Sequence, residues 1–323
     1  MGFLYSQLCV TPEVPAQSFT GQTVIVTGSN IGLGLEASRH ITQLGASRVI
    51  LAVRNVAAGK EAQQSIEQST GRNNICEVWE LDLASYASVK EFAQRASSQL
   101  PRIDVVVANA ALAATQFTLA EGHERSVTVN VISTMLLAFL LLPKLQETAS
   151  AFPDSQPCLS FVVSEVHAWT DLPERQNSNI FTALDDEEAS SIIQRYPTTK
   201  LLEVLLIREL VAARLPAHSR VVVNMLNPGL CHSQLGRDAG WGLWLLKQVL
   251  ARSTEMGSRT LVAGAAGGPE SHGAYMTDGK VANEALSSFV RSAEGEKTQK
   301  RLWDELIAIL EDVQPGVVQN FVQ

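Results

Sequence analysis

The chain has few cysteines, and they lie far apart. Four occur among 323 residues, and none is spaced from another cysteine or a histidine as in a metal site. The first 20 residues contain no Lys or Arg, so the positively charged start that a secretory signal needs is missing. We therefore expect free thiols, no bound metal and a cytoplasmic protein.

Charge and long apolar runs are also scarce. Charged residues make up 18% of the chain, the net charge is −8, and no basic stripe offers a surface for nucleic acid. The longest apolar run, MLLAFLLL at 135–142, is too short for a transmembrane segment and is typical of a buried helix. Hydrophobic residues make up 46%, which is ample for the core of a globular protein.

Short β-branched runs alternate along the chain with stretches of helical spacing. This alternation predicts right-handed βαβ units, and the near-continuous apolar strands indicate a sheet buried on both faces. We expect an α/β fold, a Rossmann-type doubly wound parallel sheet of about seven strands, in one domain (21–323) after an N-terminal arm (1–20). The expected strands are 23–27, 48–53, 75–81, 103–108, 158–163 and 220–226, and the expected helices are 33–44, 57–69, 86–99, 124–148 and 197–213.

Two segments interrupt this rhythm after strand ends. Residues 165–195 are polar and acidic, and residues 230–254 are apolar on one side. Ligands of open α/β sheets bind beyond the carboxyl ends of the strands, so both segments are candidate pocket walls, with a surface insertion as the alternative. Glycines around 236–250 make that stretch a candidate lid. Three tryptophans would suit an apolar substrate, or equally a core: Trp169, Trp241 and Trp244.

A glycine-rich turn, VTGSNIGLG, follows the first expected strand and opens the first expected helix. Glycine lets the backbone turn tightly and approach a pyrophosphate, and a helix N-terminus offers free N–H groups and a positive dipole end. The glycines are Gly28, Gly32 and Gly34, spaced TGxxxGxG. In this strand-turn-helix context the turn predicts a dinucleotide site.

The stretch RYPTTK places Tyr196 four residues before Lys200, ahead of a helix-like run. Alone, the pair is weak evidence. On a helix both side chains share one face, and a lysine ammonium beside a phenol favours phenolate, so we expect a tyrosine pKa below its usual value. A tyrosine tuned in this way can protonate a carbonyl oxygen or deprotonate an alcohol.

Several motifs in a fixed order resemble the short-chain dehydrogenase/reductase family over about residues 20–285. The local sequences at 53–55, 228–235 and 273–282 are similar to those of the family's retinol-dehydrogenase-like branch. The stretch RYPTTKLLEVLLIREL resembles fungal members of the family that act in specialised metabolism. The motifs are TGSNIGLG at 27–34, LDLAS at 81–85, ANAA at 108–111, VNVIS at 129–133, Ser164, Tyr196 with Lys200, and NPG at 227–229.

This resemblance implies catalytic roles for four residues. Tyr196 would donate or accept the proton, and Ser164 would hydrogen-bond the substrate oxygen. Lys200 would also hold the nicotinamide ribose. Asn130 would hold a water that links Lys200 to solvent as a proton relay.

The end of the second expected strand indicates which cofactor binds. NAD enzymes usually place an acidic residue there for the ribose 2′-OH, whereas this chain has Val53 and then Arg54, which suits a 2′-phosphate. We therefore expect NADP(H). The resemblance implies further cofactor contacts: Gly28, Asn30, Ile31, Gly32 and Gly34 in the turn, Asp82 and Leu83 at the adenine, Asn109 under its ribose, and Pro228, Gly229 and Ser233 at the nicotinamide amide and pyrophosphate.

Together these expectations describe an NADPH-dependent carbonyl reductase, or an alcohol dehydrogenase in reverse, for a hydrophobic small molecule, as a ketoreductase step in specialised metabolism. Reduction of an imine or an activated C=C bond is one alternative, and a cofactor-binding regulatory pseudoenzyme is another. Relatives often pair through the central helices, which implies a homodimer, unless the 31 residues between Ser164 and Tyr196 cover that face.

Overall fold

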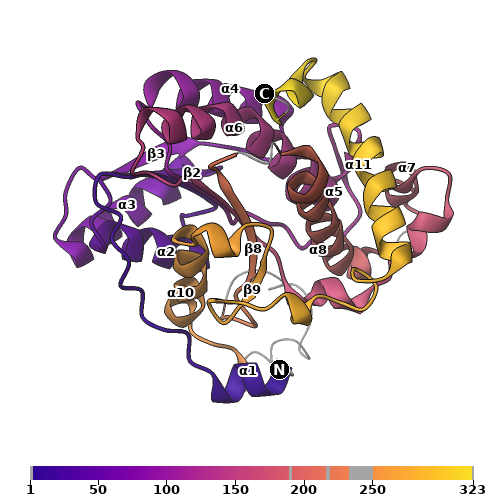
Figure 1. The fold of residues 1–323 in the computed structure, drawn as a ribbon, viewed down its shortest axis with the longest axis horizontal. Helices are drawn as coiled ribbons and strands as arrows, with labels where there is room; N and C mark the ends of the chain where they lie inside the picture. Colours follow the sequence, from indigo (N-terminus) through magenta and orange to yellow (C-terminus); the bar gives the residue numbers. More distant parts are fainter. Residues whose placement is uncertain (1–2, 189–190, 216–218, 233–249, 322–323) are drawn as a thin grey trace.

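The computed structural model describes residues 3–188, 191–215, 219–232 and 250–321. Within these residues an eight-stranded sheet has the order β10-β9-β8-β7-β4-β1-β2-β3 (Figure 1). Neighbouring strands are parallel except β9 and β10. The prediction of a doubly wound, mostly parallel sheet is confirmed. The strands are β1 Thr23–Thr27, β2 Arg48–Val53, β3 Cys76–Glu80, β4 Val105–Ala108, β7 Cys158–Val162, β8 Val222–Asn227, β9 Tyr275–Thr277 and β10 Lys280–Val281.

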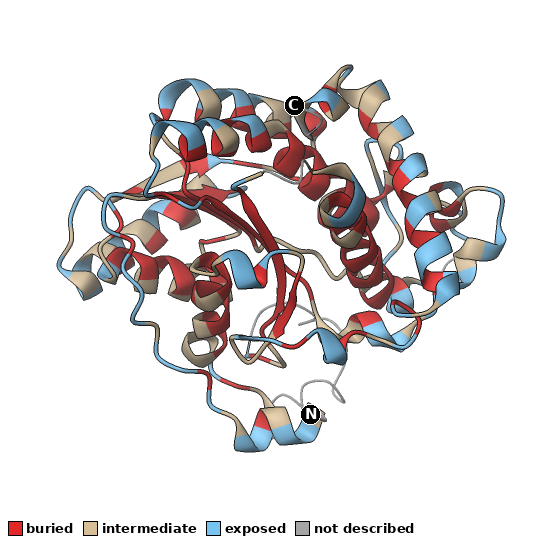
Figure 2. Cartoon of the chain, in the orientation of Figure 1, coloured by how far each residue is buried: buried red, intermediate tan, exposed pale blue. Residues whose placement is uncertain are grey.

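Helices cover both faces of this sheet (Figure 1). One face packs on α2, α3 and α10 through Val24 and Val26 of β1, and the other packs on α4, α6 and α8 through Ile25. Successive strand residues point to opposite faces, so the strand interiors are buried on both sides, as the red strands of Figure 2 show. The bounds are α2 Gly32–Gln43, α3 Val56–Thr70, α4 Tyr86–Gln99, α6 Ser133–Ala151, α8 Ile192–Glu209 and α10 Thr254–Ala265.

The helix expected over 124–148 has an irregular start. It consists of α5 (Arg125–Val127), a π-helical turn η1 (Thr128–Ile132) and α6, which continues past Pro143 to Ala151. Among the described residues this is the helix that is long and apolar enough to cross a membrane, and 83% of its most apolar window is buried inside the protein. It therefore has the burial of a core helix.

Residues 165–188 form short helical turns and then α7, while the C-terminal part adds a long helix. Ile180, Phe181 and Leu184 of α7 join the core, so this part is more than a surface insertion. The remaining elements are β5 Leu119–Ala120, β6 His123–Glu124, η2 Glu165–Trp169, η3 Pro173–Gln176, α7 Ile180–Leu184, η4 Leu210–Arg214, η5 Pro269–Ser271, η6 Asn283–Ala285, α11 Ala293–Val313 and η7 Val317–Phe321.

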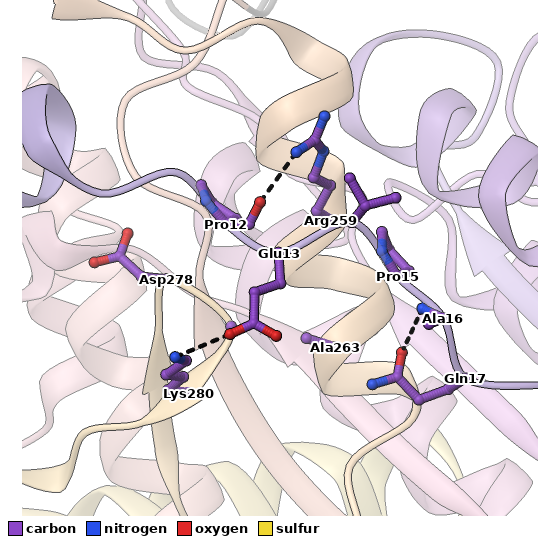
Figure 3. Close-up of a pocket in the computed structure, with 11 residues that line it drawn as sticks. Pro12, Glu13, Pro15, Ala16, Gln17, Arg259, Ala263, Asp278 and Lys280 are labelled. Carbon is purple, nitrogen blue, oxygen red and sulfur yellow. Dashed lines mark hydrogen bonds and ion pairs between the residues drawn. The ribbon is translucent and has the colours of Figure 1, made fainter.

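The N-terminal arm lies against the body of the protein. After the short helix α1 (Phe3–Cys9), the chain crosses α10 and the β9–β10 hairpin. Figure 3 shows this crossing: Arg259 of α10 donates to Pro12 O (3.1 Å), and Lys280 pairs with Glu13 (3.0 Å). A small hollow lies between the arm and these elements.

Two side chains anchor α1 to the loops that follow β8. Gln7 is buried; its amide donates to Leu230 O (2.9 Å) and Leu250 O (3.0 Å) and accepts from Leu230 N (3.3 Å). Arg252 is also buried and donates to Ser6 O (2.6 Å) and to Asp278 (2.6 Å). The arm is therefore bound to the same region that carries the NPG motif.

Candidate active site

The glycine-rich turn after β1 is closely packed at Gly28 and Gly34, where a larger side chain would not fit. Gly28 has φ +66°, and a Cβ there would lie 3.0 Å from Ala110 Cα. A Cβ on Gly34 would lie 2.6 Å from Asn109 Nδ2. Asn109 donates to Thr27 O (2.8 Å), so the loop after β4 closes onto the turn. Larger residues at 28 and 34 would push the turn away from β4.

The first turn of α2 is open to a ligand. Its N-cap residue, Ile31, is 41% exposed and makes no side-chain capping hydrogen bond. A Cβ at Gly32 would meet no atom within 4 Å, and Asn30 is partly exposed beside it. An uncapped helix N-terminus next to open space fits the phosphates of a dinucleotide, because the first backbone N–H groups lack partners within the helix.

The expected adenine side of the site lies at the ends of β2 and β3. Arg54 directly follows β2 and is exposed. Asp82 follows β3, where its carboxylate accepts from Ala84 N (2.9 Å), and Leu83 beside it is buried. These side chains border the glycine-rich turn because parallel strands end at one edge of the sheet.

The NPG motif follows β8 at the same edge. Asn227 Oδ1 accepts from Gly229 N (3.1 Å) and from Glu165 N (3.2 Å), so it joins this loop to the residues after β7. Pro228 is buried, and Gly229 has φ +76°, a conformation that favours glycine. Ser233 lies outside the described residues.

The expected catalytic side chains meet where β7 ends and α8 begins. Ser164 follows β7 and caps η2 by accepting from Val166 N (3.4 Å), and its hydroxyl is close enough to Tyr196 to lower the pKa of that phenol. Lys200 lies one turn further along α8, 5.7 Å from the Tyr196 ring centroid, and donates to Val162 O (2.9 Å). Serine, tyrosine and lysine are thus brought together although 31 residues lie between the serine and the tyrosine.

The expected direction of the tyrosine pKa is wrong for the chain on its own. Burial raises the pKa of Tyr196 above its usual value; Lys200 and the Ser164 hydrogen bond oppose this, while the Glu203 carboxylate adds to it. Lys200 is itself paired with Glu203, so its positive charge acts on the phenol only in part. Tyr196 is therefore protonated at neutral pH.

Asn130 is completely buried in the π-helical turn η1. Its side chain accepts from Leu112 N (2.7 Å) and donates to Leu112 O (2.8 Å) and to Thr199 Oγ1 (2.9 Å). Both amide protons are therefore engaged by the protein, and the side chain joins the loop after β4 to α8. π-Helical turns are frequent at functional sites, and here the turn carries the residue that makes this link.

Three residues at the site were missed by the sequence reasoning. Glu203 lies 2.7 Å from Lys200, Thr199 binds Asn130, and His167 binds the backbone carbonyl of Ser164 (2.7 Å). Glu203 could have been found, because residues three apart share a helix face. The contact of His167 could not have been predicted. A spacing of three residues indicates a contact only within a helical turn, and the sequence did not predict a turn after Ser164.

The tryptophans expected at the substrate are only partly described. Trp169 ends η2 and is 69% exposed, five residues after Ser164. Trp241 and Trp244, and the candidate lid 236–250 except Leu250, lie outside the described residues. No group of three or more potential metal ligands occurs in the part of the chain that the structure describes.

Comparison with known proteins gives relatives along the whole chain. A family model for short chain dehydrogenases matches residues 22–151. The short chain dehydrogenase/reductase dmxR8 of Cryptosporiopsis sp. is 45% identical over 99% of this chain and 100% of its own length. The short-chain dehydrogenase anuD of Penicillium roqueforti is 46% identical over 98% of this chain and 84% of its own length.

The fold agrees with these relatives. The solved Pseudomonas aeruginosa RhlG/NADP active-site complex is similar with a TM-score of 0.61 at 20% identity, over 81% of this chain and 96% of that one. At this identity the likeness concerns the fold alone. The identity to dmxR8 over nearly the full length decides the family: the chain belongs to the short-chain dehydrogenases/reductases, a family of oxidoreductases that bind nicotinamide cofactors.

Proposed function

We propose that the chain is an NADPH-dependent oxidoreductase that transfers a hydride between nicotinamide C4 and the carbonyl or alcohol carbon of a hydrophobic small molecule. We propose further that it works as a ketoreductase in the biosynthesis of a secondary metabolite. The fungal relatives support the proposed place in secondary metabolism, and the site supports the proposed chemistry.

The observation that carries this proposal is the meeting of Ser164, Tyr196 and Lys200 where β7 ends and α8 begins. Two hydroxyl groups that meet at a strand end can both bind one substrate oxygen, the serine as a fixed donor and the tyrosine as the proton source. The raised pKa keeps Tyr196 protonated at neutral pH, which suits protonation of a carbonyl oxygen during reduction. A regulatory pseudoenzyme would need neither hydroxyl.

The chain's own residues fit a dinucleotide. The open first turn of α2 and the packed glycines would hold the pyrophosphate, and Asn109 would support the adenine ribose. Arg54 would pair with a 2′-phosphate, since its charged end is exposed beside that turn. Asp82 would accept from the adenine amine, and Pro228 and Gly229 would contact the nicotinamide side.

Lys200 would supply the proton path, and Asn130 would support the structure around it. Lys200 is buried and charged, and it lies behind Tyr196 with its ammonium on Val162 O. A proton lost by the phenol can return through this ammonium group, whose own pKa is raised by Glu203 and Tyr196 against the effect of burial. Asn130 would hold the loop after β4 in the position that shields this path.

The test is a screen of apolar ketones and aldehydes that follows the loss of NADPH absorbance. Tyr196→Phe should keep cofactor binding and lower turnover by about 10²–10⁴-fold, because general acid catalysis is worth that much. Tyr5→Phe, the same change on the exposed face of α1, is the control and should keep full activity. If Tyr196→Phe kept half of the activity, Tyr196 would not be the acid.

A further inference from the structure

His167 lies three residues after Ser164 and has no solvent-exposed surface. Both of its ring nitrogens meet backbone groups: Nδ1 is 2.7 Å from Ser164 O, and Nε2 is 3.1 Å from Ser287 N. A backbone N–H only donates, so Nε2 must accept the hydrogen bond from Ser287. Nδ1 then carries the proton and donates to Ser164 O. Geometry alone therefore selects the neutral ring with its proton on Nδ1.

The imidazole is held in place from several sides. Its ring packs on Tyr275 of β9, with centroids 5.3 Å apart and the planes at 59°. The backbone N–H of His167 also donates to Ser164 O (3.2 Å), so that carbonyl accepts from this residue twice. Ser287 belongs to the segment that leads into α11. The ring thus connects the serine loop to a segment 120 residues away in the sequence.

We propose that His167 is the positioning residue of Ser164: it fixes the serine backbone, and with it the place of the hydroxyl at the end of β7, and does so only as the neutral Nδ1–H ring. This inference rests on the proposed function, because it concerns the same serine. It does not make His167 a catalytic residue, since the ring contacts backbone groups and Tyr275 rather than the reacting atoms.

Because His167 must be neutral, the site should lose its arrangement at low pH. A protonated ring would turn Nε2–H toward Ser287 N–H, and two donors would face each other. Burial lowers the pKa of His167 although the Ser164 bond opposes this, so the ring charges only below its usual range near 6.5. A histidine with a lowered pKa supports the fold above that range, and its contribution is lost as the pH falls through the lowered pKa.

The ionisable groups around the ring are few. The same turn η2 carries Glu165, whose pKa is raised to about 7 by burial, with Arg252 opposing and Asp278 adding. Tyr275 faces the ring from β9, and α8, which packs on η2, carries Arg195, Tyr196, Lys200 and Glu203. These four residues are the same in the parent and in the His167 variants. Residues 286–290 have no charged side chain. Glu165 is therefore the group whose titration has to be separated from that of His167.

A pair of amide substitutions separates the two hydrogen bonds. The Asn amide of His167→Asn lies near the position of Nδ1, so it retains a donor for Ser164 O and loses the acceptor for Ser287. His167→Gln extends to the position of Nε2 and retains the acceptor instead. We expect His167→Gln to lower kcat by about 10–100-fold with KM for NADPH unchanged, and His167→Asn to stay within about threefold of the parent.

The pH profile provides the second measurement. In a Glu165→Gln background, kcat of the parent should fall below its plateau on the acid side, and the same fall should be missing in His167→Asn, because an amide does not titrate. Equal loss of kcat in both amide variants, or an unchanged acid limb in His167→Asn, would overturn the proposal.

A third measurement is independent of any substrate. Nitrogen NMR of protein with ¹⁵N-labelled histidine distinguishes the Nδ1–H ring from the Nε2–H ring and from the charged ring. We expect the Nδ1–H form from neutral pH down to the start of the acid limb. A charged ring or an Nε2–H ring at neutral pH would refute the inference even if the enzyme proved to act on another bond, whereas an Nδ1–H ring in a protein without ketone reductase activity would refute the proposed function alone.

Discussion

Lys200 Nζ lies 2.7 Å from Glu203 Oε2, and both side chains are almost completely buried on α8. A buried ammonium group needs a counter-charge, and here the carboxylate three residues on provides it. The pair has a consequence for Tyr196, because the phenol faces a nearly neutral pair instead of a single positive charge. Glu203 raises the pKa of Tyr196 and also that of Lys200.

Glu203→Gln keeps the shape of the side chain and removes its charge. Without the carboxylate, Lys200 acts on Tyr196 with its full charge, so the pKa of the phenol should fall and the pH profile of kcat should move to lower pH by about one unit. Glu209→Gln is the matched control: this glutamate is also buried on α8, but it binds Gln299 and Arg214. An active Glu203→Gln enzyme with the parental profile would contradict the prediction.

Stability should respond to the same substitution. Loss of one member of a buried ion pair leaves the other charge uncompensated, which typically costs about 3–5 kcal/mol of unfolding free energy. Denaturant unfolding of Glu203→Gln measures this cost. Binding of NADPH should recover part of it, because a ligand that binds only the folded state stabilises that state.

Arg54 is predicted to distinguish the two nicotinamide cofactors. Its exposed guanidinium at the end of β2 would make a charge-assisted contact with a 2′-phosphate, and NADH has no such group. Arg54→Ala should weaken NADPH by about 1.5–3 kcal/mol, roughly 10–150-fold in Kd, and leave NADH unchanged. Arg48→Ala, at the other end of β2, should change neither affinity. Equal weakening of both cofactors would show that Arg54 is structural.

The local patterns in the sequence were sufficient for the sheet and for the turn at Gly28. An apolar run such as 48–53, or the spacing of the glycines, involves only residues that are close in the sequence. The strands and helices predicted from such patterns therefore lie close to their expected positions. The strands β9 and β10 were not expected, because three and two residues are too short to produce a pattern.

The site could be predicted only as far as its residues depend on short spacings. Tyr196 and Lys200 are one turn apart, so their contact was predictable. The direction of the Tyr196 pKa was not, because it depends on burial by distant elements. The partner of His167 is 120 residues away, and those of Gln7 are 223 and 243 residues away, so no local pattern contains these contacts.

Gln7 is predicted to stabilise the loops that carry the NPG motif. Gln7→Ala would leave backbone groups of Leu230 and Leu250 without their side-chain partner, and the loss of these part-buried hydrogen bonds should cost about 1–3 kcal/mol of unfolding free energy. Leu8→Ala on the exposed side of the same helix is the control and should be within about 0.5 kcal/mol of the parent. Amide hydrogen exchange of residues 229–232 should become faster in Gln7→Ala only. Equal exchange in both variants would show that the arm does not hold this loop.

The outer side of the central helices is occupied by the chain's own C-terminal part, and this predicts a monomer. Trp303 of α11 packs on Phe139 of α6 with ring centroids 5.7 Å apart, Asn320 of η7 donates to Phe139 O (3.1 Å), and α11 also packs on α8. The sequence reasoning allowed residues 165–195 to cover this side; η2 of that segment packs on α8, and α11 and η7 pack on α8 and α6 as well.

A second copy could pair through α6 and α8 only if α11 moved away, which would expose Trp303, Leu306 and Leu310. Light scattering after size exclusion should therefore give one mass near 34.9 kDa at every concentration. A mass twice as large would require a different contact surface. Trp303→Ala then distinguishes the two cases. If a dimer forms through α6 and α8, loosening α11 should strengthen that dimer. If the protein is a monomer, the variant should stay monomeric and lose about 3–5 kcal/mol of unfolding free energy.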